Sequence, residues 1–153
     1  MMEKEYMLEA VKEALFGIEN KHGGPFGCVI VKDGTIVGRG HNRVILNNDP
    51  TCHGEIEAIR DACKNLNTFD LSGCSLYTTA EPCPMCLGAC LWANIKEVFY
   101  GCNRKDTEDI GFRDNVFYKM LDKNEDSMPL IEDHKKECKD LFDKYIKIEH
   151  SLY

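Results

Sequence analysis

Residues 78–90 read TTAEPCPMCLGAC, and the rest of the chain is arranged around them. The β-branched and aromatic residues that lead into this stretch predict a strand, and Pro82 and Pro84 predict a turn followed by the start of a helix. Cys83 and Cys86 are three residues apart, so a first helical turn places both sulfur atoms on one side. The positive end of the helix dipole lowers the pKa of a thiol there, so both cysteines can be thiolates near neutral pH. Two converging thiolates make half of a tetrahedral zinc site.

The other half of the site is expected from His53-Gly54-Glu55. A His-x-Glu upstream of a Pro-Cys-x-x-Cys is the signature of zinc-dependent base deaminases, in which the glutamate moves protons without binding the metal. We therefore assign one zinc ion per chain to His53, Cys83 and Cys86, with a water or hydroxide as the fourth ligand, and acid–base catalysis to Glu55. Alone, the cysteine pair would equally fit a structural zinc site or a redox pair, and the His-x-Glu would be uninformative.

The composition narrows the class of protein. A length of 153 residues fits one domain, residues 1–153. No apolar run could span a bilayer, and the first residues lack the layout of a signal peptide, so we expect a cytoplasmic protein with no membrane partner. Seven of the nine cysteines remain after the zinc pair, an odd number that argues against a disulfide framework. Asp and Glu exceed Lys and Arg by 26 to 19, and no basic cluster stands out, which disfavours nucleic acid and favours a small, uncharged substrate.

The first half of the chain predicts two helices and a hairpin. The apolar stripe of a first amphipathic helix runs over residues 6–21 through Leu8, Val11, Leu15 and Ile18. Strands over residues 26–31 and 35–40 flank Asp33-Gly34, a strong signal for a two-residue turn. A second helix is expected over residues 53–66, with Asp49 or Thr51 as candidates for its N-terminal cap.

The second half continues the alternation. Strands over residues 76–79 and 96–101 are joined by a helix over 85–93, the crossover expected between parallel neighbours. A short helix is expected at 117–121, and a last amphipathic stripe, packing on the sheet or on a partner, consists of Cys138, Leu141, Phe142 and Tyr145. This order of elements predicts a three-layer α/β/α domain.

Four blocks make the chain similar to the cytidine deaminase superfamily, and within it to the bacterial guanine deaminases. They are GGPFG at 23–27, NNDPTCHGE at 47–55, EPCPMCLGA at 81–89, and VFY at 98–100 followed by GFRD at 111–114. The resemblance implies a five-stranded mixed sheet between helices, and a homodimer that exchanges its C-terminal segments, residues 123–153. It also implies hydrolytic deamination of guanine to xanthine and ammonia.

The resemblance further assigns substrate-binding roles to four residues. In the family the base is held by an asparagine at the position of Asn42 and an aromatic at that of Phe26, while an aspartate at Asp114 and the C-terminal Tyr153 confer guanine recognition. Taken singly, each residue also fits a plainer role. Asn42 fits a turn, Phe26 the core, Asp114 a helix cap and Tyr153 a free chain end.

Several alternatives remain open at this stage. The substrate could instead be guanosine or another small amino-purine or pyrimidine. The tRNA adenosine deaminases share the zinc signature but should show a basic groove, and a non-enzymatic zinc protein would hold the metal with four fixed ligands. Two residues depart from the family. Gly54 replaces an alanine or valine, and Arg113 stands beside Asp114, where it could pair with the carboxylate.

Overall fold

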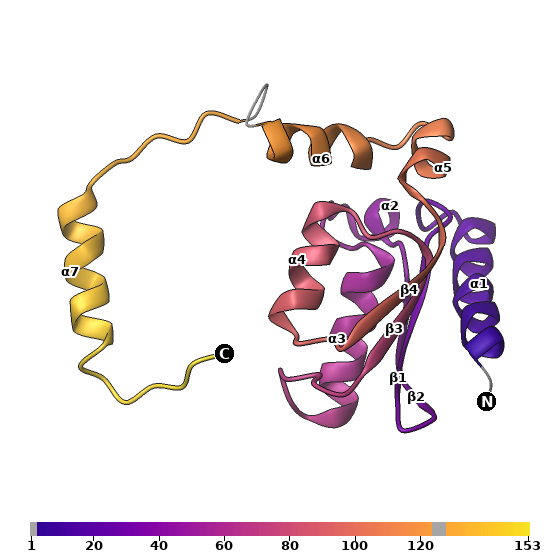
Figure 1. The fold of residues 1–153 in the computed structure, drawn as a ribbon, viewed down its shortest axis with the longest axis horizontal. Coiled ribbons are helices and arrows are strands. Elements are labelled where there is room, and N and C mark those ends of the chain that lie inside the picture. Colours follow the sequence, from indigo (N-terminus) through magenta and orange to yellow (C-terminus); the bar gives the residue numbers. More distant parts are fainter. Residues whose placement is uncertain (1–2, 124–127) are drawn as a thin grey trace.

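The computed structural model describes residues 3–123 and 128–153. Four strands form one mixed sheet in the order β2-β1-β3-β4, with β1 antiparallel to β2 and β3, and β3 parallel to β4. Helix α1 covers one face of the sheet, and α3 and α4 cover the other (Figure 1). The elements in chain order are α1 (Glu3–Glu19), β1 (Gly27–Lys32), β2 (Thr35–His41), α2 (Val44–Asn47), α3 (Gly54–Leu66), β3 (Ser75–Ala80), α4 (Pro84–Trp92), β4 (Glu97–Cys102), α5 (Arg104–Asp109), α6 (Asp114–Lys123) and α7 (Lys135–Tyr145).

The three α/β/α layers are confirmed, but the expected fifth strand is wrong. Within the described residues the sheet has four strands, and the chain after β4 forms helices. The reason is local. The Asn103 side chain accepts a hydrogen bond from the Asp106 backbone N–H, and the Asp106 carboxylate accepts one from the Asn103 N–H. This capping box begins α5 directly after β4 and leaves no extended segment to pair with its edge.

The hairpin between β1 and β2 forms as predicted. Asp33 and Gly34 both have positive φ, 49° and 80°, as a two-residue turn that matches the twist of the strands requires. Side chains then alternate along β1. Cys28 and Ile30 enter the core beneath α3 and α4, while Val29 and Val31 enter a smaller core beneath α1. Strand β1, in the interior of the sheet, is therefore buried on both faces.

Helix α1 lies on the sheet through its small residues, which corrects the predicted apolar stripe. Ala10 and Ala14 are buried, whereas Leu8 and Leu15 keep 51% and 46% of their surface exposed. The helix backbone approaches β1 so closely that a Cβ on Gly27 would lie 2.1 Å from the Ala10 carbonyl oxygen. At that close approach only small side chains fit, so Leu8 and Leu15 point outward, while Tyr6 near the start of the helix packs against Tyr77.

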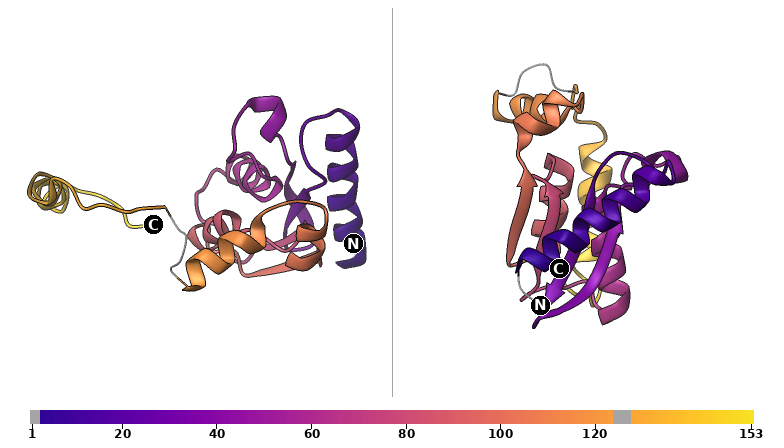
Figure 2. Two further views of the ribbon diagram at one scale, coloured as in Figure 1. Left: turned by 90° about the horizontal axis from the view of Figure 1, so that it is seen from above. Right: turned by 90° about the vertical axis from the view of Figure 1, so that its right-hand side faces the viewer.

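Helix α7 of the C-terminal segment stands away from the rest of the chain. Figures 1 and 2 show α7 apart from the sheet and its helices, and no residue of α7 is buried. The expectation that its apolar stripe packs on the sheet is wrong for the chain's own sheet, and packing on a partner stays a prediction. None of the helices in the described ranges is long and apolar enough to cross a membrane.

Candidate metal centre and active site

Three metal-binding side chains converge where α3 and α4 begin. His53 is the residue before α3 and Cys83 the residue before α4, and both have extended backbone conformations. Cys86 lies in the first turn of α4 and is fully buried. His53 Nδ1 is 3.5 Å from the sulfur of Cys83 and 3.5 Å from that of Cys86. The cap predicted from Asp49 or Thr51 does not form, because the Asp49 carboxylate accepts hydrogen bonds from Thr51 instead.

The two thiols share one hydrogen bond when no metal is present, and the expectation that both can be thiolates stays a prediction for the zinc-loaded centre. A hydrogen bond from the Cys86 thiol lowers the pKa of Cys83 to about 4, and His53 acts in the same direction. The same hydrogen bond, together with burial, raises the pKa of Cys86. The contact with Cys83 also raises the pKa of His53. A cation at this point would replace the shared proton and the imidazolium proton together.

The donor set fits a zinc ion. One imidazole nitrogen and two cysteine sulfurs lie within 4.8 Å of one another. Tetrahedral zinc with its usual bond lengths separates a nitrogen from a sulfur ligand by about 3.6 Å, which the 3.5 Å distances match. Three protein ligands are also the number that leaves a coordination position for substrate chemistry. Only these three residues form such a group in the part of the chain that the structure describes.

Glu55 lies in the first turn of α3, buried beside the metal ligands. Burial raises the pKa of its carboxyl group to about 7, and the nearby Cys83 thiolate contributes in the same direction. A carboxyl group with that pKa can hold or release a proton at neutral pH, as a general acid–base catalyst must. His53 stands before the helix and Glu55 within its first turn, so both line one cavity despite their spacing of two residues.

A cavity of about 830 Å³ opens over this centre. Of the eight site residues predicted from the sequence, six line it, and Cys86 joins them through the metal group. Its apolar walls, on α2, α4, and the segment around α6, include Val44, Ile45, Met85, Phe112 and Phe117. The volume lies in the range of small-molecule sites.

Asn42 and Phe26 form one side of the cavity. The Asn42 backbone N–H donates to the Phe26 carbonyl, and its side-chain oxygen accepts from the Val44 N–H at 3.0 Å. That second bond fixes the amide orientation and leaves the Nδ2 group to donate elsewhere. The Phe26 ring packs edge-on against Phe112, with ring centroids 4.9 Å apart.

Asp114 begins α6 on another side of the cavity, and burial raises the pKa of its carboxyl group. Arg113 does not pair with it in the described part of the chain, because the guanidinium lies over the Phe117 ring, 5.0 Å from its centroid. Two long-range contacts hold α6 over the metal loop. The Tyr118 hydroxyl donates to the Pro82 carbonyl, and Arg104, which also lies over the Tyr118 ring, pairs with Glu81 at 3.0 Å.

Tyr153 is the one predicted site residue that the structure places elsewhere. It is 81% exposed, and its ring lies 6.0 Å from those of Phe69 and Trp92, beyond the far end of α4. Sequence reasoning missed the Tyr118 and Arg104 contacts. No local pattern announces them, since each joins residues more than twenty positions apart.

The sequence profile described as the "Cytidine and deoxycytidylate deaminase zinc-binding region" matches residues 1–102, about two thirds of the chain. This chain belongs to that deaminase family. The deaminase is 50% identical to the guanine deaminase of Bacillus subtilis (strain 168) over 123 residues, 80% of this chain and 79% of the relative. It is 46% identical to a tRNA-specific adenosine deaminase of Aquifex aeolicus (strain VF5) over 100 residues, 65% and 66% of the two chains.

Among solved structures, the X-ray structure of guanine deaminase from Bacillus subtilis superimposes on the deaminase with a TM-score of 0.93 and 42% identity, covering 100% of this chain and 99% of the other. The guanine deaminase of Nitrosomonas europaea gives a TM-score of 0.70 with 31% identity over 74% of this chain and 65% of the other. The matched zinc-binding region contains His53, Cys83 and Cys86, the group that could hold a metal, and the metal of the deaminase is zinc.

Proposed function

We propose that this deaminase converts guanine and water to xanthine and ammonia. The observation that carries the proposal is the cavity itself. A metal triad and a buried glutamate stand beside an amide donor on one wall and a carboxylate on another. The likeness to guanine deaminases along nearly the whole chain supports the choice of substrate.

Zinc, when bound, would supply a Lewis acid that lowers the pKa of a water molecule, so that the water can lose a proton and attack a ring carbon at neutral pH. Glu55 takes one proton from the attacking water and gives it to the adjacent ring nitrogen while the oxygen bonds to C2. It then takes the second proton from the new hydroxyl group on C2 and gives it to the amine, so that the C2–N bond breaks, the C2 carbonyl forms and ammonia leaves. Its buried position and raised pKa suit it to both tasks. The protons balance, because those that leave the water end on the product and on ammonia.

The walls of the cavity orient the base. Asn42 Nδ2 donates to an acceptor on the purine, and Asp114 accepts from the N–H groups on its polar edge. The Phe26 ring contributes an apolar surface against the base. A base without matching donors would leave the Asp114 carboxylate unpaired in a half-buried position, which is how such a site rejects the wrong substrate.

The test is ammonia release by the zinc-loaded protein with guanine, guanosine, adenine, cytosine, cytidine and a tRNA anticodon stem-loop. We expect turnover of guanine alone. The tRNA is the rival that the Aquifex relative suggests, and the net charge of −7 disfavours it. Turnover of a nucleoside or of the stem-loop, with guanine untouched, would overturn the proposal while leaving the zinc chemistry in place.

We further propose that residues 1–153 act as one domain within a homodimer, and that the segment 123–153 of each subunit closes the cavity of the other. Residues 124–127 of that segment lie outside the described residues. The support is that the single chain leaves apolar side chains exposed both on the tail and at the rim of the cavity. Phe142 on α7 is 64% exposed, Ile45 at the cavity rim is 67% exposed, and Tyr153 lies away from its own cavity. Exchange between subunits would bury both surfaces and bring a Tyr153 to each site.

Mixing two inactive variants tests the exchange. Glu55→Gln leaves the tail intact, and deletion of Tyr153 leaves Glu55 intact. When the two are unfolded and refolded together, exchange places a normal tail over a normal centre at about one quarter of all sites, so about one quarter of wild-type activity returns. If each tail served its own subunit, the mixture would stay as inactive as its components.

A further inference from the structure

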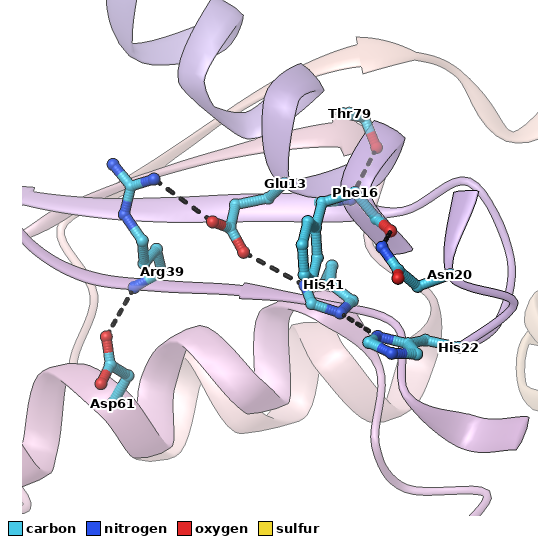
Figure 3. A network of polar contacts seen from close by, with 9 residues as sticks. Glu13, Phe16, Asn20, His22, Arg39, His41, Asp61 and Thr79 are labelled. Atoms are coloured by element: carbon cyan, nitrogen blue, oxygen red, sulfur yellow. Dashed lines mark hydrogen bonds and ion pairs between the residues drawn. The ribbon is translucent and has the colours of Figure 1, made fainter. Parts of the chain in front are cut away.

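A network of polar side chains lies between α1 and the end of β2 (Figure 3). Its histidines do not line the cavity, but their chain neighbours Gly23 and Asn42 do. His41 is 1% exposed. Its Nδ1 lies 3.1 Å from a carboxylate oxygen of Glu13, and its Nε2 lies 2.8 Å from Nδ1 of His22. The second oxygen of Glu13 pairs with Arg39 at 3.2 Å. The two imidazole rings are nearly parallel, with an angle of 16° between their planes.

The contact between the two imidazoles limits how many protons the pair can hold. The Glu13 carboxylate only accepts, so His41 Nδ1 carries a hydrogen. A hydrogen bond between His41 Nε2 and His22 Nδ1 then needs one hydrogen, carried by one ring and accepted by the lone pair of the other. If both nitrogens carried hydrogens, two N–H groups would face each other at 2.8 Å and the rings would separate. The contact between the two rings is therefore possible only while His41 Nε2 and His22 Nδ1 carry one hydrogen between them, and a second hydrogen breaks it.

Both ends of the histidine pair lead to Asn42. On one side, Asn42 follows His41 directly, and its side-chain oxygen caps the start of α2 through Val44. On the other side, the His22 carbonyl accepts hydrogen bonds from the backbone N–H groups of Ile45 and Leu46, both at 3.0 Å.

The loop after His22 packs directly against the side-chain amide of Asn42. A Cβ on Gly23 would lie 2.1 Å from the Asn42 side-chain oxygen, so the Gly23 backbone is packed directly against that group. The histidine contact thus ties the 22–24 loop, α2 and the end of β2 together around one side chain. If the rings part, the amide loses the support on both of its sides.

We propose that His22 and His41, anchored by Glu13, are positioning residues that hold the Asn42 amide toward the substrate and release it when the pair takes up a second proton. The proposal rests on the substrate-binding role proposed for Asn42. It predicts a protein that binds its substrate less tightly in acid, for a reason unconnected with the metal centre.

The surrounding charges set where this happens. The Glu13 carboxylate on α1 is the negative charge that faces the pair, and it also pairs with Arg39 on β2. Arg43 follows β2, and Asp61 on α3 accepts a hydrogen bond from the Arg39 backbone N–H. The Phe16 ring packs against both imidazoles, with centroids 5.8 Å from His22 and 5.6 Å from His41. Burial lowers the pKa of His22, and the charges of His41 and Arg43 lower it further. Release is therefore expected below the ordinary histidine range, at a pH under about 6.5.

The kinetic test uses zinc-loaded full-length protein with guanine between pH 5 and 8.5. In the wild type we expect KM to rise about tenfold on acidification, the size expected for one lost hydrogen bond. His22→Ala should show the raised KM at every pH and lose the step, with kcat little changed. Glu13→Gln should move the step to higher pH if the carboxylate only restrained the rings, and to lower pH if it favours protonation, as proposed here. Glu9→Gln, on the same helix and paired with Lys12 at the surface, is the matched control and should follow the wild type.

A second experiment tests the same proposal without any substrate. The side-chain amide resonances of Asn42, followed by NMR in the zinc-loaded protein, should shift with the same midpoint as the two imidazoles and stay constant in His22→Ala. Because turnover is not involved, this reading stands even if guanine is not the substrate. An Asn42 amide that ignores the titration would overturn the proposal. So would a KM profile that is the same in His22→Ala and the wild type.

Discussion

The body of the molecule, residues 3–123, and its tail, residues 128–153, differ in how far they bury their apolar side chains. The body buries two apolar cores and seven of the eight predicted site residues lie in it. The tail also carries an amphipathic helix, α7, yet Leu141, Phe142 and Tyr145 on it are all exposed. The contacts of a single chain account for the structure of the body. The contacts of the single chain leave the apolar surface of the tail exposed, and we propose that a partner subunit covers it. The experiments below ask how far the two regions are independent of each other.

The largest effect is expected from the body alone. Glu55→Gln removes the proton carrier while keeping its shape, and we expect kcat to fall by at least about 10³-fold, within the usual range for general acid–base catalysis. Zinc content, measured by elemental analysis, and the mass of the assembly should not change, because Glu55 is neither a ligand nor part of the tail. A variant with substantial activity would show that another group carries the proton.

Removing residues 124–153 separates the two regions directly. The truncated body should keep its zinc and its cooperative unfolding, because its cores contain no residue from the tail. Activity should fall by about 10²-fold, the scale of losing a closing element over an active site, and the assembly should shrink to a monomer in sedimentation. Loss of zinc or of cooperative folding would show that the body depends on the tail for more than closure.

The stability of the metal-free protein should depend on pH through Glu55. Its pKa is raised from 4.5 to about 7 in the folded state, so between these values the folded protein holds a proton that the unfolded chain has released. Stability therefore falls as pH rises from 4.5 to 7, by up to about 3 kcal/mol, and is level above that.

Denaturant unfolding at a series of pH values, on wild type and Glu55→Gln, checks this. In the variant, the free energy of unfolding should lack the fall with pH that is due to Glu55. Relative to the wild type, the variant should therefore become more stable as the pH rises toward 7. Added zinc should reduce the difference, because a cation beside the carboxylate favours its charged form. Parallel slopes in the two metal-free proteins would contradict the buried, proton-holding state of Glu55.

The same division between body and tail governs what the sequence could predict. The ligands His53, Cys83 and Cys86 follow from short spacings at helix starts, where local geometry decides. The buried face of α1 differs from the predicted stripe because of Gly27 on β1. The absence of a side chain there lets the backbone of α1 approach the strand, and the sequence of the helix alone does not reveal this.

The remaining errors have the same origin. The fifth strand was expected from family likeness, whereas the capping box at Asn103 ends the sheet. The contact that holds α6 over the site, from Tyr118 to Pro82, joins distant residues and leaves no mark in the local sequence. Tyr153 lies beside Phe69 and Trp92, residues far from it in the chain, so neither periodicity nor spacing could supply its placement.

The smallest expected effect lies deep in the body. Thr78 on β3 is 1% exposed, and its hydroxyl is the one buried side-chain polar atom without a hydrogen-bond partner in the described ranges. Thr78→Val keeps the shape and removes the unpaired group, so the free energy of unfolding should rise by roughly 1 kcal/mol. The neighbouring Thr79 is the matched control, because its hydroxyl donates to the Pro25 carbonyl and accepts from the Gly27 N–H. Thr79→Val should lower the free energy of unfolding by roughly 1–3 kcal/mol. If the body is self-sufficient, both shifts persist after the tail is removed; shifts that vanish with the tail would mean that the core of the body is completed by it.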